Sequence, residues 1–245
     1  MSEPLYTLSI VIPAYNEEAF IGPLLQRILA VDTEAMGFRK EIIVVDDGSR
    51  DATAARAEAF PGVRVVRQKN QGKGAAVQRG VRETSGDYVL VQDADLEYFP
   101  EDYLPLLRAL DTRKPTSVYG SRPKGVIRDR GWCWPTPGRH LRQSPGPWVM
   151  NILLSLWCGL LFGRWLSDLL TAYKIYPAGV LKGFTVRTRG FETDHELTAK
   201  LIRSGVAIVE VPIAYEPRSV EEGKKIRPRD GLIALWTFWR FRFRD

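Results

Sequence analysis

Three acidic side chains follow a short apolar run within the stretch DYVLVQDADLEYFP. Asp93, Asp95 and Glu97 stand at alternate positions directly after the apolar residues 88–91. Like charges this close repel one another, so a cation or full solvation has to compensate them. Carboxylates without a neighbouring His or Cys suit hard cations such as Mg²⁺ or Mn²⁺, which keep open positions for substrate phosphates. The simpler alternative is that the acids favour the dipole of a following helix at residues 101–110.

The elements that must position these acids alternate along the first half of the chain. Apolar, β-branched runs predict strands at residues 8–13, 40–49, 63–68, 87–92 and 116–122. Helical patterns predict helices at residues 17–31, 51–60, 72–85 and 100–110. Strands that are apolar throughout predict a Rossmann-like α/β fold, with a mostly parallel sheet flanked by helices on both faces. Ligands of such sheets bind at the carboxyl ends of the strands, where the chain places Pro13, Asp46, Asp47, Asp93, Asp95 and Arg122.

The composition limits the class of protein. The 245 residues, with 44% hydrophobic and 26% charged residues, suffice for one well-packed domain. The net charge of +6 favours anionic partners such as phosphates and acidic membrane surfaces, but we identify no nucleic-acid-binding module and expect no nucleic-acid partner. A dinucleotide-dependent oxidoreductase and a P-loop NTPase are disfavoured, because GxGxxG does not follow the first strand and GxxxxGK[ST] does not occur.

The cysteines and the N-terminus indicate the compartment. Cys133 and Cys158 are the two cysteines, and they form no CxxC pair. We therefore expect a reducing compartment, without a disulfide framework or a structural zinc site. The N-terminus lacks a basic segment followed by an apolar one, so we expect no signal peptide and a cytoplasmic protein.

The second half contains three segments of distinct composition. Residues 125–146 are rich in Pro, Gly, Arg and Trp and predict a long loop over the site. Residues 147–163 carry no charge but fall short of the roughly 20 apolar residues that span a bilayer, so we expect a helix in the core or at a membrane interface. Residues 229–245 combine Trp, Phe and Arg, which suits an anionic membrane surface. The alternative for this basic aromatic tail is a helix packed on the core with solvated arginines.

Five motifs occur in an order and spacing that resemble the family 2 glycosyltransferases, which are inverting enzymes of the GT-A fold. The motifs are SIVIPAYNEEAFI, EIIVVDDGSRDAT, NQGKGAAVQRG, GDYVLVQDADLEYFPED and YGSR. The second half resembles the branch that loads a sugar onto polyprenyl or dolichyl phosphate, such as the dolichyl-phosphate mannosyltransferases, in DLLTAYKIY, GFETDHELTAKLIRSGVAIVEVPIAYEPRSVEEGKKI and RDGLIALW. The resemblance implies a catalytic domain over residues 1–228, in which residues 125–146 form an acceptor loop and residues 147–163 an apolar interfacial segment.

The resemblance also implies the residues of the donor site. The base and ribose of a nucleotide diphosphate sugar would contact Pro13, Tyr15, Glu17, Val45 and Asp47. The diphosphate would bind at Asp93, Ala94 and Asp95. Asp93 and Asp95 would hold Mg²⁺ or Mn²⁺, with Glu97 as the third ligand in a place where the family often has Gln.

Basic residues are implied to bind the remaining phosphates. Arg122 would contact the sugar phosphate or the acceptor phosphate, and Arg218 and Lys224 would clamp phosphates. For Arg218 and Lys224 the alternative is a solvated basic loop. In DLLTAYK, Asp168 remains, but Leu170 stands where the branch commonly has an acid. The predicted long loop forms either an acceptor lid or a basic surface loop, and it carries Arg128, Arg130, Arg139 and Arg142.

Asp194 has two candidate roles. In glycosyltransferases that use a sugar hydroxyl, the acid at this place resembles a general base, whereas a phosphate acceptor is already ionised and needs none. The alternative is an ordinary helix start, in which Thr193 caps the helix and Glu196 completes a capping box. His195 replaces a proline that is common in the family, and we expect it to be a neutral structural residue.

The sequence therefore predicts a metal-dependent, inverting hexosyltransferase. It would use a nucleotide sugar of the GDP-mannose or UDP-glucose type and a polyprenyl phosphate acceptor, while attached peripherally to the cytoplasmic face of a membrane. Two alternatives stay open. The same fold could act on a sugar hydroxyl in glycan or polysaccharide synthesis, with Asp194 as base, or the chain could be a non-catalytic nucleotide-sugar-binding module.

Overall fold

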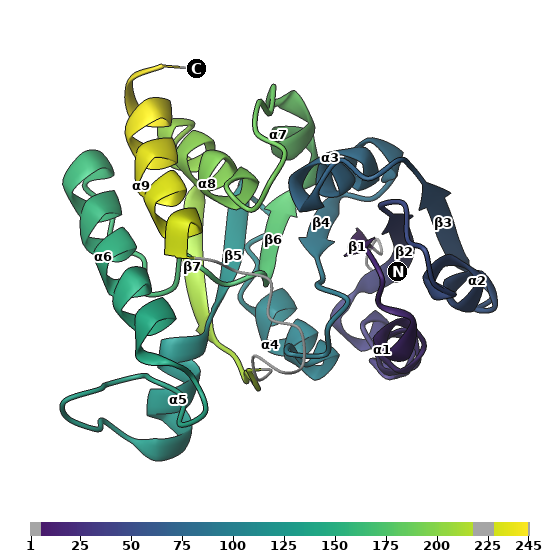
Figure 1. Ribbon diagram of the computed structural model, residues 1–245, viewed down its shortest axis with the longest axis horizontal. Helices are drawn as coiled ribbons and strands as arrows, with labels where there is room; N and C mark the ends of the chain where they lie inside the picture. The colour runs from purple at the N-terminus through teal and green to yellow at the C-terminus, as the bar shows by residue number, and fades with distance from the viewer. Residues whose placement is uncertain (1–5, 218–227, 245) are drawn as a thin grey trace.

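The computed structural model describes residues 6–217 and 228–244, and these contain one mixed sheet (Figure 1). Its strands are β1 (Tyr6–Ala14), β2 (Phe38–Asp46), β3 (Val63–Arg67), β4 (Tyr88–Val91), β5 (Thr116–Ser121), β6 (Lys174–Pro177) and β7 (Ala207–Pro212). They lie in the order β3-β2-β1-β4-β6-β5-β7. Neighbouring strands are parallel except at β6, which runs antiparallel to β4 and β5. The predicted, mostly parallel α/β sheet is confirmed.

Helices lie on both faces of this sheet (Figure 1). They are α1 (Glu18–Ala30), α2 (Thr53–Glu58), α3 (Lys73–Glu83), α4 (Tyr103–Arg108), α5 (Arg122–Arg130), α6 (Pro145–Phe162), α7 (Ala178–Gly183), α8 (Thr193–Arg203) and α9 (Pro228–Phe243), with short 3-10 turns at Glu34–Met36 and Pro100–Asp102. In the first half of the chain, strands and helices follow the predicted alternation and differ from the predicted bounds by a few residues.

Alternate residues of the central strands face two separate cores. On β1 and β2, Ile10, Ile12 and Val44 enter one core, whereas Val11 and Val45 enter the other. Helices α1, α2 and α4 contribute to the first core, and α3, α6, α7, α8 and α9 contribute to the second. Because both faces are covered, these strands need no polar face, which explains why their sequences are apolar throughout.

Two elements differ from the expectations. The strand β6 was not predicted, because its four residues, KIYP, include a lysine and a proline and form no apolar run. The loop predicted at residues 125–146 is wrong over its first part, because α5 continues to Arg130. The side chain of Ser121 caps this helix by accepting the N–H of Lys124 at 3.2 Å, and Pro123 lies in its first turn, where proline is favoured.

The two apolar segments of the second half form neighbouring helices, α6 and α9 (Figure 1). The indole N–H of Trp157 on α6 donates to the Leu235 carbonyl on α9 at 3.0 Å. Phe238 of α9 is completely buried. Over its described residues, the segment predicted as a tail is thus a helix packed on the rest of the fold. Among the described helices, α6 alone has the length and composition to cross a membrane.

The packing of α9 can be tested with two phenylalanines of the same helix. Phe238 lies against the rings of Phe162 and His195, with centroids 6.1 and 5.3 Å away, whereas Phe243 is 63% exposed. We expect Phe238→Ala to lower the free energy of unfolding by about 3–5 kcal/mol, because it leaves a cavity. Phe243→Ala should cost about 1 kcal/mol or less. Urea denaturation measures both, and equal effects would contradict this packing.

Candidate active site

The loops after β1 and β2 are hydrogen-bonded to each other. Asn16 has a φ of 53°, in the left-handed region that Asn tolerates better than most residues. Its Oδ1 accepts the N–H of Arg50 at 2.9 Å, and its own N–H donates to Ser49 Oγ at 3.0 Å. The N–H of Glu17 donates to Thr53 Oγ1 at 2.8 Å. The YNEE and DDGSRDAT motifs therefore form one continuous edge where β1 and β2 end.

The residues predicted to bind the nucleoside lie along this edge but differ in accessibility. Pro13 and Val45 are partners in the register of β1 and β2. Pro13 and Tyr15 are half-buried, and the side chain of Glu17 is largely buried. Val45 is completely buried in the second core, so only its main chain is available to a ligand. Their roles in nucleoside binding stay predictions.

Asp47 secures the loop that follows β3. Its carboxylate accepts Gln68 Nε2 at 2.7 Å and the N–H groups of Gln71 and Gly72, both at 2.9 Å. Its own N–H donates to the Ala14 carbonyl at 2.9 Å. A carboxylate offers about four acceptor positions. Asp47 thus ties three strand ends together, and its role in binding the base stays a prediction.

The acids after β4 do not continue the alternation of the strand. Leu96, with a φ of 58°, turns the chain between Asp95 and Glu97. Asp95 Oδ1 accepts the N–H of Glu97 at 3.2 Å, and the Glu97 carboxylate accepts the hydroxyl of Tyr215 at 2.8 Å. Within residues 6–217 and 228–244, no three His, Cys, Asp or Glu side chains converge into a ready metal cage. Glu97 as the third ligand stays a prediction.

Lys73 is the cation that compensates the acids. Its ammonium group lies 2.6 Å from Asp93 Oδ1. Burial lowers its pKa, but the carboxylates of Asp93, Asp194 and Asp95 outweigh burial, so the pKa lies above its ordinary value. The tertiary structure therefore gathers the acids after β4 and an acid of α8 around one lysine. Lys73 lies within the motif NQGKGAAVQRG, but the motif alone does not indicate this role.

The close approach of α3 to α8 depends on Gly74. A Cβ at this position would lie 2.0 Å from Thr193 Oγ1 and 2.6 Å from the Gly190 carbonyl oxygen. The next residue, Ala75, donates its N–H to the Arg189 carbonyl at 3.0 Å. Glycine at position 74 therefore lets the first turn of α3 carry Lys73 to the acids.

The start of α8 does not contain the capping box considered as an alternative. Glu192 is the N-cap residue and makes no side-chain cap bond, so Glu196 lies one position too deep in the helix. Glu196 is completely buried and accepts the N–H groups of Arg187 and Thr188 at 2.9 and 2.8 Å. It fixes the segment before the helix instead of capping it.

Asp194 faces a buried lysine. Its side chain is 25% exposed, and Oδ2 lies 3.9 Å from the Nζ of Lys174, which is completely buried. Burial lowers the pKa of Lys174, against the opposing effect of Asp194. The carboxylate of Asp194 thus interacts electrostatically with two lysines, Lys73 and Lys174. Its role as a base stays a prediction.

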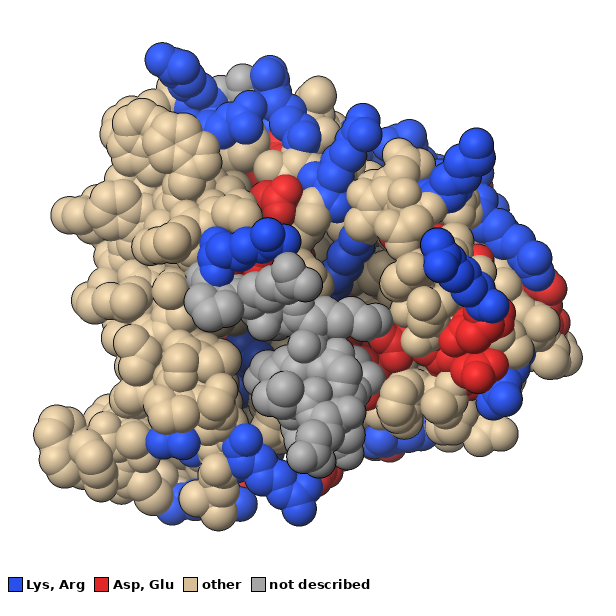
Figure 2. Space-filling view, in the orientation of Figure 1, with Lys and Arg blue, Asp and Glu red and all other residues tan. Residues whose placement is uncertain are grey.

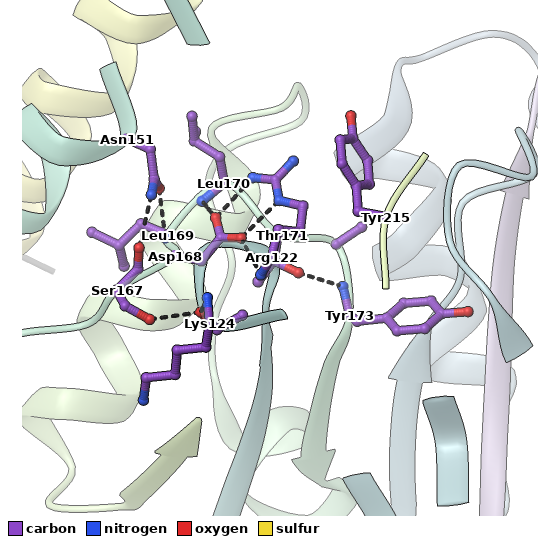
Figure 3. A network of polar contacts seen from close by, with 12 residues as sticks. Arg122, Lys124, Asn151, Ser167, Asp168, Leu169, Leu170, Thr171, Tyr173 and Tyr215 are labelled. Carbon is purple, nitrogen blue, oxygen red and sulfur yellow. Dashed lines mark hydrogen bonds and ion pairs between the residues drawn. The ribbon is translucent and has the colours of Figure 1, made fainter. Parts of the chain in front are cut away.

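Asp168 holds Arg122 in one orientation (Figure 3). Nε and Nη2 of Arg122 donate to the two carboxylate oxygens of Asp168, each at 2.7 Å, and the Arg122 N–H donates to Oδ2 at 3.0 Å. Asp168 is completely buried, and the Arg122 side chain is 14% exposed. The guanidinium also lies 4.8 Å from the ring centroid of Tyr215, whose hydroxyl binds Glu97. Arg122 is therefore fixed close to the acidic loop.

The other predicted basic residues divide into two groups. Arg218 and Lys224 lie outside the described residues. Of the arginines predicted to lie in the long loop, Arg128 lies on α5 and pairs with Asp129 at 2.6 Å, and Arg142 pairs with Glu216 at 2.6 Å. Both arginines are paired with carboxylates of the protein, and their role in an acceptor lid stays a prediction.

The donor chemistry of the acids fits a hard divalent cation. Asp93 and Asp95 offer only oxygen ligands, which Mg²⁺ and Mn²⁺ prefer over nitrogen and sulfur. Two carboxylates suffice for such an ion, because it keeps water and substrate phosphates as its other ligands. Asp93 and Asp95 would therefore hold the metal.

The sheet topology and the acids at its carboxyl edge match the GT-A fold. Solved structures of glucosyl-3-phosphoglycerate synthase from Mycobacterium tuberculosis share this fold. One, in complex with Mn²⁺, UDP and glucosyl-3-phosphoglycerate, matches with a TM-score of 0.66 and 24% identity, over 98% of this chain and 81% of that chain. Another, in complex with Mg²⁺ and UDP, matches with a TM-score of 0.64 and 25% identity, over 95% and 79%.

The chain belongs to glycosyl transferase family 2, whose model matches residues 9–153. It is 30% identical to a dolichol-phosphate mannosyltransferase of Mycosarcoma maydis, over 96% of this chain and 80% of the relative. It is 31% identical to a dolichol-phosphate mannosyltransferase of Pyrococcus furiosus, over 89% and 58%. It is 34% identical to a dodecaprenyl-phosphate galacturonate synthase of Rhizobium johnstonii, over 71% and 49%. The chain thus spans about half the length of several curated relatives that it matches.

The stability of the fold should depend on pH through His195. This residue is buried, its Nδ1 has no hydrogen-bond partner in the described part of the chain, and burial lowers its pKa to about 3. It is therefore neutral in the folded protein at physiological pH. The unfolded chain takes up a proton at a pKa of about 6.5. The contribution of His195 to the free energy of unfolding is therefore fully present above pH 6.5 and is lost as the pH falls towards 3.

His195→Met removes this titration. Between pH 7.5 and 5.0, we expect the variant to lose about 2 kcal/mol less of its free energy of unfolding than the unsubstituted chain. Urea denaturation at both pH values measures the difference. Equal losses in both proteins would show that His195 is protonated in the folded state.

Proposed function

We propose that this chain transfers a hexose from a nucleotide diphosphate sugar to polyprenyl phosphate, with inversion at the anomeric carbon. One observation carries the proposal. A fixed cation, Arg122, is linked through Tyr215 and Glu97 to Asp95, which with Asp93 forms an acidic pair suited to a metal. Arg122 and a metal held by the acidic pair would each bind an anion. Two such sites suit a reaction in which a diphosphate leaves and a phosphate attacks.

The donor side of the reaction uses the acids and Lys73. Mg²⁺ or Mn²⁺, when bound at Asp93 and Asp95, neutralises charge on the diphosphate that leaves. Asp47 and the loop it holds orient the nucleoside, and this fixes the distance from the anomeric carbon to the attacking oxygen. The presence of UDP with Mn²⁺ or Mg²⁺ in the related synthase structures supports this assignment of the donor edge.

The acceptor side uses Arg122. Its guanidinium would bind the phosphate of the polyprenyl acceptor and present one phosphate oxygen to the anomeric carbon. This oxygen is already ionised at neutral pH, so the attack requires no general base. The pairing of Asp194 with Lys174, and its effect on Lys73, suit an orienting residue better than a free base. The names of the dolichol-phosphate and dodecaprenyl-phosphate relatives support a lipid phosphate acceptor.

Transfer can be tested with labelled GDP-mannose and UDP-glucose, a short-chain polyprenyl phosphate and Mn²⁺. We expect one donor to yield a lipid-linked sugar that mild acid releases. Asp95→Asn should lower the rate about 100-fold, because it removes a charged metal ligand from the diphosphate site. Asp111→Asn is the matched control, since Asp111 is a surface acid paired with Arg113 and Lys114.

Other results would count against the proposal. Product on a sugar hydroxyl alone would favour the glycan-synthesis alternative, and binding of the nucleotide sugar without turnover would favour the binding module. Full activity of Asp95→Asn without added metal would overturn the assignment of the acidic pair.

We also propose that α6 and α9 rest on the cytoplasmic face of a membrane. They carry a set of exposed apolar side chains, here called the α6–α9 apolar face: Val149, Leu153, Leu156, Leu160, Leu232, Ile233, Trp236, Trp239 and Phe243. Figure 2 shows that this side of the molecule is almost free of charge, with Lys and Arg near its upper and lower ends. Trp and Arg next to aliphatic residues suit an interface with anionic lipids. A polyprenyl phosphate acceptor requires such a location.

Vesicle sedimentation tests this attachment. Leu156→Asp places a charge on the apolar face, where Leu156 is 55% exposed, and should weaken binding to anionic vesicles about tenfold or more. Leu29→Asp, on α1, changes an exposed leucine on the other side of the sheet and should leave binding unchanged. Equal sedimentation of both variants would contradict the assigned face.

A further inference from the structure

The helix α6 has an apolar side that is exposed and a second side that is buried against the fold. Leu153, Leu156 and Leu160 belong to the α6–α9 apolar face. Asn151 and Leu154 are buried on the second side. Asn151 carries the one side-chain amide of α6, a mostly apolar helix without charged residues. A buried amide is costly unless its donor and acceptor are both satisfied, so its partners identify what it does.

The amide of Asn151 binds the main chain on both sides of Asp168 (Figure 3). Its Nδ2 donates to the Ser167 carbonyl at 2.8 Å, and its Oδ1 accepts the N–H of Leu169 at 3.0 Å. The two bonds use both ends of the amide and fix the turn at residues 167–169. The buried helix face thereby sets the position of the Asp168 backbone.

The turn is held from its opposite side by Glu210. Its Oε1 accepts the N–H groups of Ser167 and Asp168 at 2.7 and 3.2 Å, and its Oε2 lies 3.1 Å from the Nζ of Lys124. Glu210 belongs to β7 and Lys124 to α5, so these contacts come from elements other than α6. Asn151 is the contact that comes from α6.

Asp168 in turn determines where the Arg122 guanidinium points. The bidentate pair uses Nε and Nη2 of Arg122. In the described part of the chain no group binds Nη1, which leaves its N–H groups for an anion. A rotation of the turn would move both carboxylate oxygens and, with them, the free end of the guanidinium.

We infer that Asn151 is a positioning residue for the acceptor phosphate. It ties the helix that carries the apolar face to the turn that orients Arg122. The inference rests on the proposed function, since it assigns Arg122 to the acceptor. The contact with the bilayer and the binding of the lipid phosphate would then share one rigid element, so that a lipid phosphate at the membrane surface meets a guanidinium already in place. Preorganised donors of this kind avoid reorganisation during the reaction.

The test is Asn151→Leu, which keeps the volume of the side chain roughly constant and removes both hydrogen bonds. We expect the KM for polyprenyl phosphate to rise about tenfold, because the acceptor cation is misplaced. The Kd of the nucleotide sugar, measured by calorimetry with Mn²⁺, should change less than about twofold, because Asp47 and the acids after β4 are untouched. A purely structural role would not produce this difference between acceptor and donor.

Ser155→Ala is the matched control. Ser155 lies one turn along the same buried side and donates only to the Asn151 carbonyl, at 2.9 Å. It should leave the acceptor KM and the donor Kd unchanged. Should Asn151→Leu fail to fold, Asn151→Ser removes the same two bonds with a smaller side chain, and the same difference is expected.

Two results would overturn the inference. One is an unchanged acceptor KM in a folded Asn151 variant, and the other is an equal change in acceptor KM and donor Kd. Failure of the unsubstituted chain to use polyprenyl phosphate would reject the proposed function itself, and the inference with it. Normal turnover of the unsubstituted chain together with either of the two results would reject the inference alone.

Discussion

The ion pair between Lys73 and Asp93, at 2.6 Å, is the interaction on which the site depends. Without a cation, the carboxylates of Asp93, Asp95 and Asp194 would repel one another at a poorly solvated edge of the sheet. The lysine reaches them only because α3 packs closely on both sides. Gly80 allows the helix to lie against β1, where a Cβ would be 2.3 Å from a methyl of Val11, and Gly74 allows it to approach α8. Compensation of the acids by Lys73 thus depends on the close packing of α3, which Gly74 and Gly80 allow.

The pair between Arg122 and Asp168 applies the same principle on the acceptor side. Burying two charges costs several kcal/mol, and only good geometry with further hydrogen bonds offsets that cost. The bidentate contact supplies the geometry. The further hydrogen bonds come from the main-chain N–H of Arg122 and from Asn151 and Glu210, which bind the turn at residues 167–169. Such a pair is a weak source of stability but an effective way to fix direction. A cation held in one orientation can bind a phosphate without being reorganised.

Much of the fold followed from the sequence, and the exceptions have physical causes. The strands β1, β2 and β4 were predictable because each contains a run of apolar residues, which is typical of buried parallel strands. The strand β6 was missed because four residues between two antiparallel neighbours depend on the sheet around them for their conformation. The helix α5 was missed because RPKGVIRDR has no apolar stripe, and its start depends on a cap by Ser121. The capping box considered at α8 does not form because the N-cap is Glu192 instead of Thr193. A difference of one residue is within the usual precision of a helix boundary.

The sequence by itself determined the family, the order of the elements and the acids at the strand ends, because those features reside in contiguous motifs with their own periodicity and chemistry. Only the tertiary structure decided which cations meet those acids. Lys73 interacts electrostatically with Asp194, and Asn151 binds the main chain on both sides of Asp168, so both interactions link separate elements. No local pattern encodes such contacts, because they depend on the packing of α3 against α8 and of α6 against the sheet. The acids of the site could therefore be identified from the sequence, whereas the partners that orient them depend on how the helices pack.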